Sequence, residues 1–167
     1  MTILDSSFIS RTRRNHGLEH ATINILSGIY PYRPMAGYSF PGGFFIFGDI
    51  PTDQVREAAV QALSRMNNGE HYLAIHPGCG TNYAVAGFLV GALVWLGMAG
   101  AKNKREKVAR LPLAIMLATF GLIASQPLGP MVQERITTSA DVQGVSILDI
   151  FPIRFGRLSI HEVLTRS

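Results

Sequence analysis

Residues 83–100 read YAVAGFLVGALVWLGMAG, and this apolar stretch decides how the chain is organised. No Asp, Glu, Lys or Arg occurs between Leu73 and Ala101. At about 1.5 Å per residue, a helix of this length crosses the roughly 30 Å hydrocarbon core of a bilayer. It also lacks the polar face that a helix of a soluble domain normally shows. The stretch therefore predicts a transmembrane helix.

A second uncharged run extends from Leu111 to Gln133 and is rich in Leu, Ile, Met and Ala until Pro127 and Pro130 break it. Together the two runs predict a transmembrane helical hairpin over about 82–100 and 111–130. The alternative is a pair of buried core helices in a soluble protein. Within the first run, Gly87 and Gly91 form a G-x-x-x-G pair, which allows close helix packing within the hairpin or in a homodimer.

The charges are distributed unevenly around this hairpin. Residues 1–81 hold six basic and six acidic side chains and residues 131–167 hold four of each, so the whole excess of +4 lies in loop 101–110. The positive-inside rule predicts that such a loop lies in the cytoplasm. We therefore expect an integral protein of the bacterial inner membrane, with the lipid bilayer as a partner. Because the excess charge belongs to this loop, the sequence does not indicate nucleic-acid binding.

The polar parts of the chain predict a mixture of helices and strands. Two aromatic-rich runs, 36–40 and 44–49, flank a Pro-Gly-Gly turn and predict a β-hairpin. A helix begins at 51–53 and ends at 67–69, and residues 72–75 resemble a short strand. Near the C-terminus, 142–150 and 153–164 predict two strands around Pro152.

These elements predict an α+β fold with a small two-layer head domain. Residues 1–81 would form its N-terminal part, and residues 131–167 would return to the same sheet as C-terminal strands. Residues 82–130, the transmembrane hairpin, would be an insertion near the middle of this domain. A head divided in this way needs both halves in order to fold.

The first helix carries the run His16-Gly17-Leu18-Glu19-His20, an H-x-x-E-H pattern. On a helix this spacing places both imidazoles on one face one turn apart, where they can share a metal, and the adjacent carboxylate can act as a base. Thr12 or Asn15 would cap the helix, which would end at Gly28. The alternative is that both histidines are merely solvated or hydrogen-bonded.

A catalytic metal site normally takes three protein ligands and leaves a position for water. The run His76-Pro77-Gly78-Cys79 supplies the favoured third ligand, Cys79 first and His76 second, whereas both together would close a structural site. Cys79 alone could instead be a buried free thiol before a helix that Thr81 or Asn82 caps. As the only cysteine, it excludes an intrachain disulfide and a four-cysteine zinc site. The remaining candidate ligands are Glu70, His71, expected in an exposed loop, and His161, which strand alternation places on the surface.

The motif His16-Gly17-Leu18-Glu19-His20-Ala21 resembles the metal helix of pitrilysin and mitochondrial-processing-peptidase metalloproteases and of S-ribosylhomocysteine lyase. This resemblance implies that His16 and His20 are ligands and that Glu19 is the general base or acid. The peptidases take a third glutamate ligand downstream, but this chain has no acidic residue between Glu70 and Glu106. The lyase uses a cysteine ligand, as Cys79 would be, together with a second cysteine that this chain lacks. The whole chain also resembles a family of small bacterial membrane proteins with a similar histidine helix and an H-P-x-C-G-T-N loop.

The sequence therefore predicts a membrane-anchored hydrolase that depends on a divalent metal, zinc by preference, and most concretely a metallopeptidase with Glu19 as general base. Phe44, Phe45, Ile46 and Phe47 would bind the peptide or protein substrate if their strand lies at a sheet edge. The competing class is a non-enzymatic membrane protein or complex subunit, in which the histidines hold a structural metal or cofactor.

Overall fold

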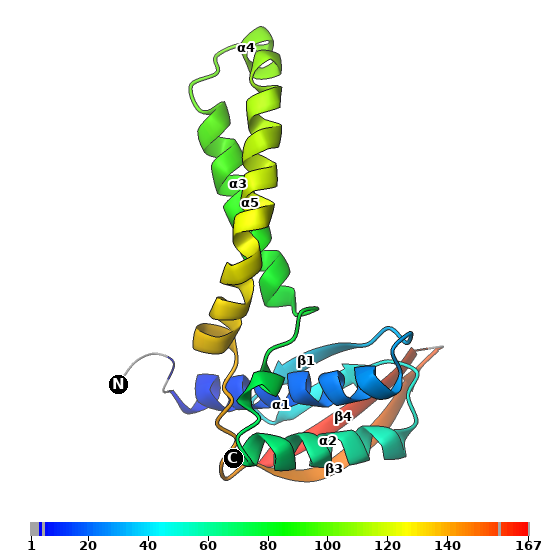
Figure 1. Ribbon diagram of the computed structural model, residues 1–167. Helices are drawn as coiled ribbons and strands as arrows, with labels where there is room; N and C mark the ends of the chain where they lie inside the picture. The colour runs from blue at the N-terminus through cyan, green and yellow to red at the C-terminus, as the bar shows by residue number, and fades with distance from the viewer. Residues whose placement is uncertain (1–3, 5, 157, 167) are drawn as a thin grey trace. The chain divides into compact units, whose positions relative to one another are not determined.

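The computed structural model describes residues 4, 6–156 and 158–166. The chain divides into two compact units (Figure 1). We call Met1–His76 together with Glu134–Ser167 the head, and Pro77–Gln133 the helical insert. The mixture of helices with an antiparallel sheet confirms the predicted α+β class.

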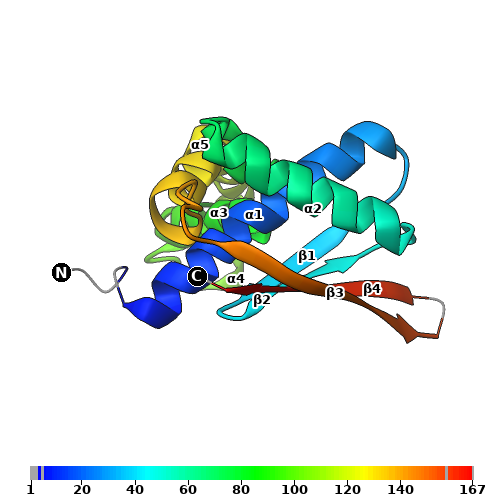
Figure 2. The ribbon, with the colours of Figure 1, turned by 90° about the horizontal axis from the view of Figure 1, so that it is seen from below.

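Two helices of the head, α1 (Ser7–Ile29) and α2 (Thr52–Asn67), lie on the same face of the sheet (Figure 2). The second begins directly after Pro51, as its sequence predicts. The prediction that Thr12 or Asn15 caps the first helix is wrong, because α1 starts earlier and both residues lie inside it. The Thr12 hydroxyl donates to the carbonyl of Phe8 one turn back, and the buried Asn15 amide donates to the carbonyl of Phe40.

The sheet contains β1 (Ala36–Phe40), β2 (Gly43–Phe47), β3 (Ser146–Phe155) and β4 (Leu158–Arg166) in the order β1-β2-β4-β3. All three pairings are antiparallel, and the hairpin of β1 and β2 is confirmed. The C-terminal strands turn at Gly156, whose φ of 61° suits glycine, rather than at Pro152. Pro152 is tolerated within β3 because this is an edge strand.

Two expectations about strands are wrong. The segment Phe44–Phe47 is not a sheet edge, because β2 pairs with β1 on one side and with β4 on the other. Phe44 and Ile46 are fully buried as well, and the edges are β1 and β3. Residues 72–75 do not form a strand either, since His71–Ala74 is a short 3-10 helix, η2.

The core of the head lies between α1, α2 and the sheet. Its buried members come from both halves of the sequence and include Leu18, Leu26, Phe44, Ile46, Val55, Met66, Ile150 and Val163. The middle of α1 is buried on several sides, and four of its buried side chains are polar: Asn15, Glu19, His20 and Thr22. Buried polar groups need hydrogen-bond partners, so the surroundings of α1 must supply them.

The helical insert consists of α3 (Gly80–Met98), α4 (Lys104–Ala109) and α5 (Leu111–Val132). Because Gly121 has no side chain, α5 approaches Val90 and Leu93 of α3 closely. At Gly87 and Gly91 no atom lies near enough to meet an added Cβ, so the G-x-x-x-G pair does not form the packing between α3 and α5. The segments Gly80–Met98 and Leu111–Thr137 are long and apolar enough to cross a membrane.

Two details of the insert differ from expectation. The basic loop contains the short helix α4, which Asn103 caps by accepting from the backbone N–H of Glu106 at 2.9 Å. Pro127 and Pro130 do not end α5, which continues to Val132. Each proline removes only one backbone donor.

We expect a chain that ends after Ile75 to remain unfolded. Without β4, the inner strand β2 loses one of its two partners, and the core loses Val163 and Ile150. Asn15 also loses the hydroxyl of Thr165, which donates to it at 2.7 Å. Circular dichroism during heating, compared with the full chain in the same detergent, is the measurement. A cooperative transition of the fragment would contradict this expectation.

Candidate metal centre

The two motif histidines lie side by side on α1. Their ring centroids are 4.3 Å apart, with an interplanar angle of 61°. His20 is buried, whereas His16 is partly exposed. The spacing of four residues therefore brings the two imidazoles together as the helical geometry predicts.

Each of these imidazoles is held by a backbone carbonyl. The Nδ1 atom of His16 lies 2.9 Å from the carbonyl oxygen of Thr137, in the π-helical turn η3 (Gln133–Thr137). The Nδ1 atom of His20 lies 2.8 Å from that of Ala74, at the end of η2. Because a carbonyl only accepts, Nδ1 is the protonated atom in both rings, and in the neutral form Nε2 carries the lone pair. Metal-binding histidines commonly have this arrangement.

Glu19 is buried and faces strand β1. The hydroxyl of Ser39 donates to its Oε2 at 2.5 Å. A Cβ at Gly37 would overlap the Glu19 carboxylate, so this glycine makes room for the carboxylate beside the strand. The motif carboxylate is therefore fixed against an edge strand of the sheet.

His76 lies near the same pair, with its ring centroid 5.8 Å from that of His20. Its Nδ1 lies 2.7 Å from Oδ1 of Asn24, a residue that sequence reasoning missed. The signal for Asn24 was its spacing, four residues after His20 on the same helical face. The sequence gives no such signal for Ser39, for Gly37 or for the two carbonyls that bind the imidazoles. Only the tertiary fold brings these groups to the motif.

Cys79 belongs to the helical insert and is buried. It is itself the N-cap of α3, with its Sγ accepting from the backbone N–H of Thr81 at 3.4 Å. The expectation that Thr81 or Asn82 caps this helix is wrong, because the helix already begins at Gly80.

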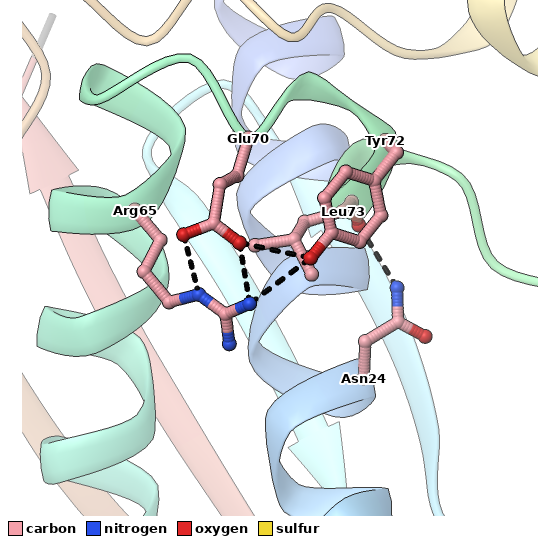
Figure 3. Close-up of polar contacts among 5 residues, drawn as sticks. All are labelled: Asn24, Arg65, Glu70, Tyr72 and Leu73. Carbon is pink, nitrogen blue, oxygen red and sulfur yellow. Dashed lines mark hydrogen bonds and ion pairs between the residues drawn. The ribbon is translucent and has the colours of Figure 1, made fainter.

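The remaining candidate ligands have other surroundings. Glu70 pairs with Arg65, with 2.5 Å between Oε2 and Nη2, and accepts from the Tyr72 hydroxyl at 2.8 Å (Figure 3). Hydrogen bonds from Arg65 and then from Tyr72 lower the pKa of the Glu70 carboxyl to about 2. His71 is exposed, as expected.

The expectation that His161 lies on the surface is wrong. It points to the core face of β4, is only 2% exposed, and has its Nε2 3.3 Å from the hydroxyl of Thr52. Burial lowers the pKa of this imidazole. It is therefore a core histidine under α2.

A cavity of about 420 Å³ lies between η2 and the segment that follows α5. Its walls come from the same two segments whose carbonyls hold His20 and His16, and they consist of His71, Tyr72, Ala74, Ile75, Glu134, Thr138 and Ala140. The head thus has a cavity beside Ala74.

Comparison with known proteins matches the chain to a protein family and to a relative from a bacterium. A family model described as "Domain of unknown function (DUF6391)" matches residues 11–150. An uncharacterised protein of Picosynechococcus sp. is 34% identical over 136 residues, which cover 76% of this chain and 65% of that relative. No solved structure matches the chain significantly.

Proposed function

We propose that this chain, which belongs to the family described as "Domain of unknown function (DUF6391)", is a membrane-anchored, metal-dependent hydrolase and most concretely a metallopeptidase. The observation that carries the proposal is the geometry of His16 and His20. Two imidazoles one helical turn apart both donate Nδ1–H to a carbonyl, so both offer Nε2 to a metal. The buried carboxylate of Glu19 stands next to His20 in the chain.

Cys79 is the proposed third ligand. Two imidazoles with one thiolate are a donor set that suits zinc. A divalent metal bound there would supply Lewis acidity toward a carbonyl and would lower the pKa of a water molecule.

Glu19 is the proposed general base, accepting the proton of the attacking water and passing it to the leaving group. The hydrogen bond from Ser39 holds one carboxylate oxygen and so orients the other. Burial in the head keeps this carboxylate from rotating freely in solvent.

Strand β1 is the proposed docking edge for an extended peptide or protein segment. It pairs with β2 on one side only, and Ala36, Gly37 and Tyr38 are exposed. An added strand would make backbone hydrogen bonds along this edge. Because Gly37 and Ser39 lie against Glu19, such a segment would pass close to the proposed base.

The helical insert is the proposed membrane anchor. The length and apolar composition of its two long helices support this, as does the exposure of apolar side chains such as Phe88 and Trp95 on α3. The basic segment 101–110 would lie in the cytoplasm of a bacterium, and Gly87 and Gly91 could pack against a second copy.

A non-enzymatic metal protein is the second candidate, and the position of His76 near His20 favours it. If His76 and Cys79 both bind, the site has four protein ligands and is closed, which is typical of structural zinc. Three ligands would leave a position for water. X-ray absorption spectroscopy of the zinc-loaded protein counts the ligands and separates the two candidates.

Metal analysis tests the site itself. We expect about one divalent metal per purified chain, lost in His16→Ala and in His20→Ala because each variant removes one of the two proposed imidazole ligands. His71→Ala is the matched control, since it removes an exposed imidazole from the head and should retain the metal. Inductively coupled plasma mass spectrometry gives the number of metal ions per chain. A native chain without metal, or a His16→Ala variant that retains it fully, contradicts the proposal.

A further inference from the structure

Asn24 extends the motif along the same face of α1. It follows His20 by four residues and His16 by eight, so the helix presents H-x-x-E-H-x-x-x-N. Its Nδ2 donates to the carbonyl of Leu73 at 2.9 Å, drawn in Figure 3, and to that of Ile75 at 3.0 Å. Its Oδ1 lies 2.7 Å from Nδ1 of His76.

These contacts fix the orientation of the Asn24 amide. Only the NH2 group can donate to the two carbonyls, so the atom that faces His76 is the amide oxygen. An amide oxygen only accepts, and therefore Nδ1 of His76 carries the proton. In the neutral ring the lone pair of His76 is then on Nε2, as it is in His16 and His20.

Asn24 also holds the segment that orients His20. The two carbonyls it binds belong to Leu73 and Ile75, which flank Ala74. The carbonyl of Ala74 lies 2.8 Å from Nδ1 of His20. One amide side chain therefore sets the proton position of His76 directly and that of His20 through the backbone.

We infer that Asn24 is a positioning residue that fixes His20 and His76 in the Nδ1–H tautomer, in which Nε2 carries the lone pair. The tautomer assignment rests on the hydrogen bonds alone. Its consequence for metal affinity rests on the proposed function, because hydrogen-bond partners of metal-binding histidines typically alter affinity by about 10–100-fold.

The test is the ¹⁵N spectrum of the imidazoles in the metal-free full-length protein in detergent, at a pH where the rings are neutral. Long-range ¹H–¹⁵N correlations distinguish a protonated from an unprotonated ring nitrogen. In the wild type we expect His20 and His76 to have Nδ1 protonated. In Asn24→Ala we expect both rings to become mixtures of the two tautomers, and zinc affinity, measured by competition with a chelator, to fall about 10–100-fold.

Asn15→Ala is the matched control. Asn15 is a buried asparagine of the same helix with two hydrogen bonds, to Phe40 and Thr165, which lie in the sheet. Asn15→Ala should lose stability, as we also expect of Asn24→Ala, but His20 and His76 should keep their tautomers. A merely structural role of Asn24 would make the two variants alike.

Asn24→Asp supplies a second variant if Asn24→Ala does not fold. Aspartate keeps an acceptor toward His76 but lacks the two N–H donors of the amide. His76 should therefore stay protonated on Nδ1, while His20 should become a mixture of the two tautomers. The inference is overturned if the wild-type rings carry the proton on Nε2, or if His20 is unaffected in both variants. A wild type with the expected tautomers that binds no zinc would instead contradict only the proposed function.

Discussion

Replacing Glu19 by glutamine should lower peptide hydrolysis by about 10²–10⁴-fold while leaving the metal content of the protein unchanged. Glutamine has nearly the same shape as glutamate and can still accept from the Ser39 hydroxyl, which donates to the carboxylate at 2.5 Å. It cannot accept a proton at neutral pH, so the variant removes the proposed base and keeps the packing. Turnover of fluorescein-labelled casein and metal analysis of the same sample give the two readouts.

Glu57→Gln is the control for this change. Glu57 is an exposed residue of α2, so its substitution should leave both turnover and metal content as they are in the wild type. A Glu19→Gln variant with wild-type turnover would show that the motif carboxylate is not the base. Loss of metal together with turnover would show that Glu19 supports the metal rather than the proton transfer.

Replacing Gly17 by alanine should destabilise the head by about 1–3 kcal/mol and weaken metal binding. A Cβ at this position would overlap the carbonyl oxygen of Ser139, which belongs to the backbone and cannot move by a simple side-chain rotation. The segment around Ser139 would have to move away from α1. Thr137, two residues earlier, would then lose its hydrogen bond to His16.

Thermal unfolding in detergent and chelator competition measure the two effects of Gly17→Ala. Gly28→Ala is the matched control on the same helix, because a Cβ there meets no atom within 4 Å. Since alanine also favours the helix, Gly28→Ala should be neutral or stabilising by about 0.4–1 kcal/mol. Equal stabilities of the two variants would mean that the close approach of the Ser139 backbone to Gly17 does not contribute to the stability of the head.

The sequence correctly predicted those features that depend only on residues close together in the chain. The two apolar runs, the β1–β2 hairpin and the helix with His16 and His20 each depend on residues close together in the chain. Their periodicity and turn residues therefore suffice to predict them. The side-by-side imidazoles are a direct consequence of the spacing of four.

The C-terminal strands join the sheet of the β1–β2 hairpin as expected, but other features that depend on distant pairing were predicted wrongly or missed. The expected substrate contact of Phe44 and Ile46 required an edge strand, but β4 pairs with their strand from more than a hundred residues away. Likewise, His161 alternates like a surface residue, although its side of β4 is the one covered by α2. The sequence carries no local signal for the order of strands in a sheet.

The hydrogen-bond partners of the two imidazoles were also missed, because they too lie far from the motif in the sequence. The carbonyls of Ala74 and Thr137 are backbone atoms, and any residue type could supply them. The segment 72–75 has the apolar residues of a strand, yet Asn24 binds its carbonyls and the chain turns as η2. Only the folded chain shows which backbone groups hold the motif.

The two carbonyls that hold the imidazoles lie on the two connections between the head and the helical insert. Ala74 precedes the insert by three residues, and Thr137 follows its last residue by four. A pull on either connection therefore acts, through one backbone hydrogen bond, on one histidine ring. If the insert spans a bilayer and the imidazoles bind a metal, as proposed, a force that the bilayer exerts on the insert would reach the metal ligands through these two hydrogen bonds.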